Sequence, residues 1–353
     1  METQQPFDRG GLSRRAFIQS ASVIAGTAAV AGMAGGPGAA KAAELAEPTA
    51  KGRMKVGCLS WCFHSFAGGV DPTEAIDTVG GLGFDGIELI VNAREDMKTV
   101  WAGESLDRIR SRLDRHKLQV SQFVLFQPVV PGLASPEKRV RDENVGAFEA
   151  GCRIAAKLNA PIIDIVSPWP TGYGAEHGYL PRFYEMSNPG RDDKFHIGIA
   201  DDFEWSKVWS DFVETTRECV RLAGSLGLKM TIEHHTHCLI HDATSFMWLC
   251  EAVGDRNLGY NLDAGWTLSQ REYPPLAIHK VGPRLMNLHM RDIDGQMRRF
   301  PPFGTGVMDH KAIVEACRKI HFNGFFSIEQ DKGGFDMLET CKRYLRIMRE
   351  DIG

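Results

Sequence analysis

Residues 229–263 read KMTIEHHTHCLIHDATSFMWLCEAVGDRNLGYNLD and contain one strand–helix–strand unit. Lys229–Glu233 and Leu258–Asp263 are short β-rich runs, and the helical pattern between them begins near Ala243. Both runs end in an acidic residue. Because a helix that joins two parallel strands is the basic unit of α/β proteins, this stretch predicts an α/β fold with a parallel sheet.

The same alternation extends in both directions from this unit. We expect eight strands, at residues 55–63, 86–91, 119–126, 161–166, 229–233, 258–263, 285–291 and 325–329. The helical runs between and after them carry apolar residues at helical spacing and begin near residues 71, 105, 135, 206, 243, 274, 309 and 335. Eight such units in roughly 300 residues predict a single (β/α)8 TIM barrel. No Gly-x-Gly-x-x-Gly follows the first strand, so a dinucleotide-binding fold lacks its main signature.

Residues 1–42 have the composition of an export signal. Ser13-Arg14-Arg15-Ala16-Phe17-Ile18 is a twin-arginine pattern, an Ala/Gly-rich stretch follows, and Ala40-Lys41-Ala42 is a small-x-small cleavage site. A transmembrane anchor is the alternative, but the stretch is too rich in Gly and Ala to make a good span. We therefore expect residues 43–353 to form a barrel that is periplasmic or secreted, with no stable membrane anchor after cleavage.

The composition excludes some classes of partner. The 353 residues are 43% apolar and 24% charged, with a formal net charge of −4 at pH 7. Nucleic acids and anionic membranes need clustered Lys and Arg, so this charge argues against both as the main partner. The eight cysteines form no Cys-x-x-Cys pair, and we assign no chemistry to them.

The connection after the fourth strand, residues 167–205, is long for a loop inside a compact domain. It carries three prolines before Arg182, many glycines and eight aromatic residues, and this aromatic density argues against disorder. A lid over the active site and a contact in a homo-oligomer both fit this composition, and the sequence does not separate them.

The last four strands each end in a side chain suited to bind a metal ion. These residues are Glu233 in Thr-Ile-Glu-His-His, Asp263 in Asn-Leu-Asp-Ala-Gly, His289 in Asn-Leu-His-Met-Arg-Asp and Glu329 in Ser-Ile-Glu-Gln-Asp. In a TIM barrel the C-terminal strand ends form the active site, so four consecutive strands can direct these groups to one point. Three carboxylates and one imidazole suit Mn²⁺, Mg²⁺ or Co²⁺ better than metals that prefer thiolates. We expect one divalent ion, Mn²⁺ first, with Mg²⁺, Co²⁺ or Zn²⁺ as alternatives.

From Lys55 to the C-terminus the sequence resembles the xylose-isomerase-like barrel superfamily, which includes sugar epimerases, hydroxypyruvate isomerase, inosose dehydratase and endonuclease IV. The most specific similarities are Glu233, the Leu-Asp-Ala-Gly turn at Asp263, the His-x-Arg-Asp run at His289, the Gly304-Thr305-Gly306 loop ahead of Asp309, and Glu329. The family usually has His-x-Lys-Asp. The resemblance implies that the four matching positions bind one divalent metal. In the keto-sugar epimerases of the family the two Glu ligands are also the acid/base pair on opposite faces of the substrate, which implies that role for Glu233 and Glu329.

The chemistry of such a site agrees with these roles. A metal chelated by a carbonyl oxygen and the neighbouring hydroxyl acidifies the carbon-bound proton between them and stabilises the enediolate that forms. A carboxylate near that carbon can then act as the base. Strand alternation places His235 and His237 on the face of Glu233, and Arg291 on the face of His289. Arg291 is expected to hold a substrate oxygen. His235 is a candidate substrate contact, with a plain polar barrel residue as the alternative.

Three further residues are candidates for substrate binding. His64 and Gln127 lie near the ends of the first and third strands. Trp266 follows Asp263 by three residues, where family members with a second metal or a substrate-binding imidazole often have His. An aromatic side chain there suggests a stacking platform for a sugar ring and weakens a reading with several metals. Endonuclease IV needs more His ligands and a basic groove, which this acidic chain does not offer.

The leading hypothesis is an isomerase or epimerase that acts on a sugar, cyclitol or hydroxy-ketone through a metal-bound enediolate. The alternative uses the same site as a lyase or hydrolase, in which a 3-keto-glycoside loses its aglycone after proton removal next to the ketone. Export and the aromatic loop favour this alternative over a phosphosugar isomerase. A sugar-binding or sensor protein without catalysis is a third hypothesis, and four intact ligands argue against it. In all three the partner is a small carbohydrate.

Overall fold

The computed structural model describes residues 53–170, 173–174, 198–236, 238–297, 299–331 and 333–353. The twin-arginine segment, most of the 167–205 connection and His237 lie outside the described residues. None of the described helices is long and apolar enough to cross a membrane.

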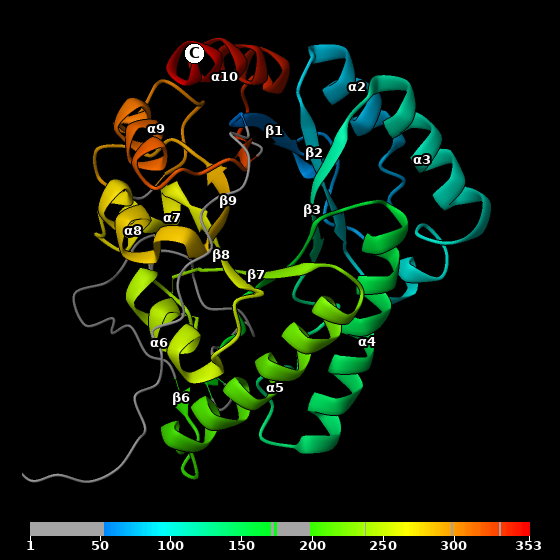
Figure 1. Cartoon of the computed structure of the whole chain (residues 1–353), viewed down its shortest axis with the longest axis vertical. Coiled ribbons are helices and arrows are strands. Elements are labelled where there is room, and N and C mark those ends of the chain that lie inside the picture. The colour runs from blue at the N-terminus through cyan, green and yellow to red at the C-terminus, as the bar shows by residue number, and fades with distance from the viewer. Residues whose placement is uncertain (1–52, 171–172, 175–197, 237, 298, 332) are drawn as a thin grey trace, which may run out of the picture. The chain divides into compact units, whose positions relative to one another are not determined.

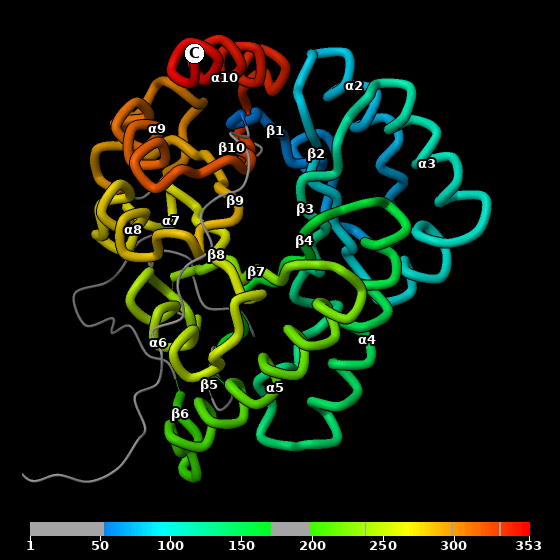
Figure 2. The backbone as a smooth tube through the Cα atoms, viewed as in Figure 1, coloured from blue at the N-terminus to red at the C-terminus, as the bar shows by residue number. Residues whose placement is uncertain are grey.

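Eight parallel strands close into a barrel in the order β1-β10-β9-β8-β7-β4-β3-β2. They are β1 (Lys55–Leu59), β2 (Gly86–Val91), β3 (Gln119–Leu125), β4 (Ile162–Val166), β7 (Lys229–Glu233), β8 (Leu258–Asp263), β9 (Leu285–Met290) and β10 (Phe325–Ile328). Figure 2 follows the chain through these strands. The prediction of a single (β/α)8 TIM barrel is confirmed.

Helices surround the barrel and follow one another around it in chain order (Figure 1). They are α2 (Thr73–Leu82), α3 (Gly103–His116), α4 (Lys138–Lys157), α5 (Trp205–Ser225), α6 (Ala243–Val253), α8 (Pro274–Val281), α9 (His310–Lys319) and α10 (Met337–Ile352). The short helix α7 (Ala264–Ser269) directly follows β8. Within the long connection, β5 (Tyr173–Gly174) pairs in an antiparallel manner with β6 (Gly198–Ile199).

The first strand is shorter than its sequence pattern predicts. The expected strand covered residues 55–63, but β1 ends at Leu59 and residues Ser60–Cys62 form a 3₁₀ turn. The prediction was wrong beyond Leu59, because an apolar run does not distinguish a strand from a short buried turn. This turn carries Trp61, which contacts the site described below.

Strand β2 shows how alternation divides the side chains between the helices and the barrel interior. All six of its residues are buried. Ile87 and Leu89 belong to the hydrophobic core of the molecule, whereas Glu88 on the opposite face hydrogen-bonds across the barrel interior to Asn287 of β9. Ile90 shares the face of Glu88, two residues nearer the C-terminal mouth. The interior therefore has its own polar layer, and this layer positions the site.

Candidate metal centre

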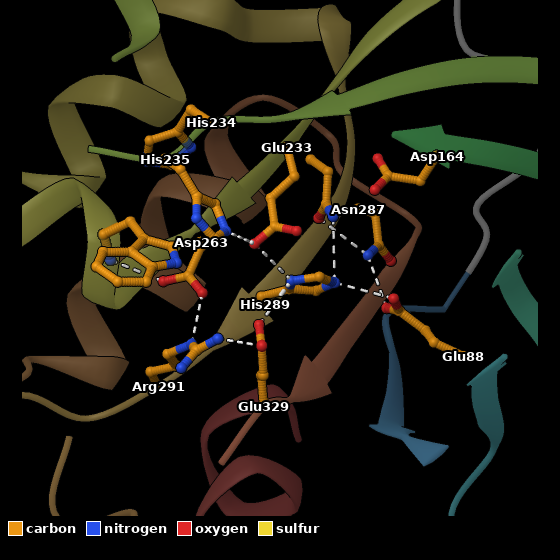
Figure 3. Close-up of polar contacts among 12 residues, drawn as sticks. Glu88, Asp164, Glu233, His234, His235, Asp263, Asn287, His289, Arg291 and Glu329 are labelled. Atoms are coloured by element: carbon orange, nitrogen blue, oxygen red, sulfur yellow. Dashed lines mark hydrogen bonds and ion pairs between the residues drawn. The ribbon is translucent and has the colours of Figure 1, made fainter. Parts of the chain in front are cut away.

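The four predicted ligands meet above the barrel axis. One ligand atom from each of Glu233, Asp263, His289 and Glu329 lies within 4.8 Å of the other three, and all four residues are buried. Figure 3 shows the His289 ring between Glu233 and Glu329, with Asp263 beside them. Glu233, Asp263 and His289 lie in β7, β8 and β9, and Glu329 directly follows β10.

The individual atoms are held by their surroundings. His289 Nδ1 lies 3.3 Å from Glu233 Oε1 and 3.0 Å from Glu329 Oε2. Asp263 Oδ1 accepts the backbone N–H of Trp266 at 2.7 Å, so this ligand is also the N-cap of α7. Trp61 Nε1 donates to Glu329 Oε1 at 3.3 Å.

The residues fit a divalent cation. Two buried atoms at the centre, His289 Nδ1 and Glu329 Oε2, have no hydrogen-bond partner of acceptable geometry among the described residues. These two atoms lie 3.0 Å apart, but a buried imidazole nitrogen and a buried carboxylate oxygen that make no hydrogen bond are unfavourable unless something else satisfies them. A cation with oxygen and nitrogen ligands would do so. Glu233, Asp263, His289 and Glu329 would hold it.

The charge of the cluster leads to the same conclusion. Burial raises the pKa of Glu329, but the Arg291 guanidinium and the His289 ring together outweigh it and lower the pKa to about 2. Burial likewise acts on Glu233, where the rings of His289 and His235 hold the pKa well below its usual range. For Asp263, burial prevails over Arg291 and raises the pKa to about 7. Neighbouring cations thus stabilise the charges of Glu233 and Glu329, whereas the buried charge of Asp263 is not fully compensated, and a bound cation would compensate it.

Arg291 links the ligands to one another. Its Nε donates to Asp263 Oδ2 at 2.7 Å, its Nη2 forms an ion pair with Glu329, and its Nη1 lies 3.2 Å from Asp331 Oδ2. The guanidinium lies over the Phe300 ring, 4.7 Å from the ring centre. Its polar atoms are therefore directed at three carboxylates of the protein.

A layer of polar side chains fills the barrel below the ligands, where TIM barrels ordinarily pack Val, Ile and Leu. Its members come from six strands and are fully buried: Glu88, Gln122, Asp164, Thr231, Asn261 and Asn287. Within this layer, the Thr231 hydroxyl lies 2.9 Å from Gln122 Oε1 and 2.5 Å from Asp164 Oδ1. Burial and the charge of Glu233 raise the pKa of Asp164 well above its usual range. Asp164 is therefore expected to be protonated, which limits the charge of the layer.

Glu88 connects this layer to the centre. Its Oε2 lies 2.9 Å from His289 Nε2, on the side of the ring opposite the ligands (Figure 3). Its Oε1 accepts from Asn287 Nδ2 at 2.8 Å, and its Oε2 also accepts from Gln122 Nε2 at 3.2 Å. A carboxylate on Nε2 favours the tautomer with its proton there, which leaves the Nδ1 lone pair free for a metal.

The predicted substrate contacts have different surroundings. A cavity of about 130 Å³ adjoins the centre, and Gln127, His235 and Arg291 line it together with Glu233 and Glu329. His235 Nε2 lies 3.2 Å from Glu233 Oε1.

His64 and Trp266 are not among the described lining residues. His64 Nδ1 lies 2.9 Å from the Ser65 carbonyl oxygen. Trp266 is fully buried, and its ring centre lies 4.7 Å from that of His235. The aromatic surfaces that do line the cavity belong to Trp61, Phe66 and Phe126.

Sequence reasoning missed these aromatic residues, Asp331 and the polar layer. For Glu88 a signal existed, since GIELIV contains one acid in an otherwise apolar strand. A buried acid in such a run needs a partner. For Asn261 and Asn287 the signal was weaker, although each lies two residues before a ligand and so shares its face of the strand.

Asp292 organises the loop that follows β9. Its two carboxylate oxygens accept the backbone N–H groups of Ile293, Gly304, Gly306 and Met308 at 2.8–3.1 Å. A Cβ at Gly306 would lie 2.3 Å from Asp292 Oδ1, so glycine is required there. The Gly304-Thr305-Gly306 motif thus packs directly against the residue next to Arg291.

A second cavity, of about 730 Å³, lies at the opposite end of the barrel. Its lining includes Lys55, Gln119 and Lys229, the first residues of their strands. Because catalytic groups in TIM barrels lie at the C-terminal strand ends, we do not assign this cavity to the site.

Solved structures with the same fold cover most of the chain. A D-psicose 3-epimerase determined with D-fructose is 22% identical, with a TM-score of 0.65 over 85% of this chain and 100% of that one. The 3-keto-D-glucoside 4-epimerase of E. coli is 13% identical, with a TM-score of 0.64 over 84% of this chain and 100% of that one. A probable 3-DHS dehydratase of Bacillus anthracis is 15% identical, with a TM-score of 0.63 over 84% and 99%.

A comparison with curated protein sequences finds no match. The family model described as xylose isomerase-like TIM barrel matches residues 76–350. This match covers most of the barrel, including all four ligand positions. The chain therefore belongs to the xylose isomerase-like TIM barrel family.

Proposed function

We propose that the protein is a divalent-metal-dependent isomerase or epimerase that acts on a sugar, cyclitol or hydroxy-ketone. The observation that carries this proposal is the position of Glu233 in β7 and Glu329 just after β10, whose carboxylates approach the same nitrogen of His289. Two carboxylates at one centre allow one to remove a proton from a carbon and the other to return it. Mn²⁺ is the cation that we propose.

A divalent cation bound here would acidify the proton on the carbon next to a sugar carbonyl. The residues of the chain supply the rest. Arg291 and Trp61 hold Glu329, and His235 holds Glu233, so each base keeps its orientation. The neighbouring His and Arg side chains lower both pKa values, so either carboxylate is ionised and can act as the base, and the one that returns a proton must first be protonated.

The same first step serves a lyase. If a 3-keto-glycoside loses its C2 proton to a carboxylate, the C1–O bond can break, and the aglycone leaves with a proton as the free alcohol. The fold does not separate the two reactions, since it occurs in the keto-glucoside epimerase and in the dehydratase named above. The aromatic cavity residues favour the lyase when the substrate carries an apolar aglycone.

Proton exchange tests the proposed function. We expect the Mn²⁺-loaded protein in D₂O to place deuterium next to the carbonyl of a ketose, cyclitol ketone or 3-keto-glycoside, as seen by proton NMR. Glu329→Gln should lower exchange by about 10²-fold or more, because Gln cannot accept a proton. Retained Mn²⁺ binding would show that this variant keeps its centre. Release of an alcohol would identify the lyase, and wild-type turnover in Glu329→Gln would disprove the acid/base assignment.

A further inference from the structure

The cavity beside the centre is divided between the two halves of the barrel. Its ionisable lining residues belong to β7, β9 and β10 or follow them: Glu233, His235, Arg291, Glu329 and Asp331. Its apolar lining residues belong to β1–β4 or follow them: Trp61, Phe66, Ile90, Val124, Phe126 and Val166. A ligand in this cavity therefore meets charge on one side and hydrocarbon on the other.

Strand alternation builds this division into the sheet. Ile90, Val124 and Val166 each lie two residues beyond a member of the polar layer, on the same face of the strand. On β7, the residue two beyond Thr231 is the acid Glu233. The interior of β2–β4 thus changes from polar to apolar at the mouth, whereas that of β7 remains polar. Because the residues lie on strands, the division is rigid.

An aromatic strip extends the apolar half from the chemistry to the surface. Trp61 is 7% exposed and donates to Glu329. Its ring centre lies 6.2 Å from that of Phe66, which is 44% exposed and stacks on Phe126 at 5.1 Å with an interplanar angle of 25°. Phe66 therefore contacts both Trp61, beside a metal ligand, and Phe126, and Phe66 itself is open to solvent. An exposed apolar ring that is continuous with a cavity is typical of a ligand-binding surface.

We propose that the substrate carries a flat apolar group beyond its hydroxy-carbonyl unit, as an aryl glycoside does, and that Trp61, Phe66 and Phe126 bind this group. The inference rests on the proposed function for the polar end of the ligand. Gln127 is the one amide side chain among the described lining residues, and it follows β3 in the apolar half. In a free keto-sugar, the hydroxyls that are not bound at the centre would face the apolar lining residues and find few hydrogen-bond partners there. Such unpaired hydroxyls lower the affinity. An aryl group has no such groups to satisfy and stacks on aromatic rings.

Equilibrium binding of two unreactive ligands tests the inference separately from catalysis. Phenyl β-D-glucoside and methyl β-D-glucoside share the sugar and differ in the apolar group. By calorimetry on the Mn²⁺-loaded protein, the phenyl glucoside should bind roughly tenfold more tightly. Phe66→Ala should remove most of this preference, because it should lower the affinity for the phenyl glucoside far more than that for the methyl glucoside. Trp248→Ala, which removes a 62% exposed ring on α6 that does not line the cavity, is the matched control and should change neither affinity.

Three outcomes would overturn the inference: equal affinity of the wild type for both glucosides, no binding of the phenyl glucoside at millimolar concentration, or an equal loss for both ligands in Phe66→Ala. Neither ligand has to react, so the result does not depend on proton exchange. Deuterium exchange without aryl preference would leave the proposed function standing and remove this inference. Aryl preference without deuterium exchange on any tested ketone would leave this inference standing and remove the proposed function.

Discussion

At the scale of single residues, Glu88 is expected to influence the centre although it is neither one of the four ligands nor a lining residue of the cavity. It is fully buried, and His289 Nε2 lies against it at 2.9 Å. Glu88→Gln keeps an acceptor for this nitrogen but removes the charge, and should weaken Mn²⁺ binding by about 10–100-fold. Calorimetric Mn²⁺ titration measures this effect. Glu95→Gln, at a side chain that is 70% exposed, is the control. Unchanged Mn²⁺ affinity in a folded Glu88→Gln protein would contradict the positioning role.

The ligands could be predicted from the sequence, whereas their support could not. Glu233, Asp263 and His289 each lie near the end of a strand with a clear pattern, so fold and position together indicated the centre. Glu88 supports His289 from β2, which is not a neighbour of β9 in the sheet. A contact across the barrel interior has no periodicity in the chain. The role of Arg291 was also open, because the sequence does not tell whether a guanidinium faces a substrate or the carboxylates of the protein.

At the scale of elements, Asp292 and the loop at residues 304–306 form a unit whose stability can be measured. The Asp292 carboxylate accepts four backbone N–H groups. Asp292→Asn replaces one acceptor oxygen by a donor, and unpaired N–H groups should lower the free energy of unfolding by about 1–3 kcal/mol or more. Urea unfolding provides the measurement. Asp309→Asn at the N-cap of α9 should cost less than about 0.5 kcal/mol, because Asn caps as well as Asp. Equal losses in the two variants would contradict this account of the loop.

Most elements followed from apolar periodicity and turn residues, and the exceptions have physical causes. β2, β7 and β8 have the predicted bounds, and α6 and α8 begin where expected. Helix α7 was missed because it has six residues and begins directly after a strand. Its cap is Asp263, whose role as a ligand was evident and whose role as a cap was not.

For the whole molecule, the centre connects four of the eight strands, so metal binding and folding should be coupled. A cation that binds only the folded state stabilises it by about 2.7 kcal/mol at a concentration 100 times its Kd. Excess Mn²⁺ should therefore raise the melting temperature, and a chelator should lower it. Asp263→Asn and His289→Ala should remove most of this response. The same melting curve with Mn²⁺ and with chelator in the wild type would exclude a metal at these residues.

The closed barrel was the most predictable property, because eight repeats of one pattern leave few other arrangements. The role of residues 1–42 in export stays a prediction from the sequence. So does the alternative of lid or oligomer contact for the long connection, which lies largely outside the described residues.

The division of the cavity has a consequence for how such a protein changes over generations. Among the described lining residues, every apolar one lies between positions 61 and 166, and every ionisable one lies between 233 and 331. Substitutions at Phe66, Phe126 or Gln127 can therefore alter which molecule is accepted without touching a ligand. Among the described contacts, two residues of the first stretch hydrogen-bond to ligands of the centre: Trp61 to Glu329 and Glu88 to His289. Selection for a new aglycone can therefore act on the part of the gene that encodes residues 61–166. The residues that carry the reaction are encoded by a separate part, for residues 233–331, which can remain unchanged.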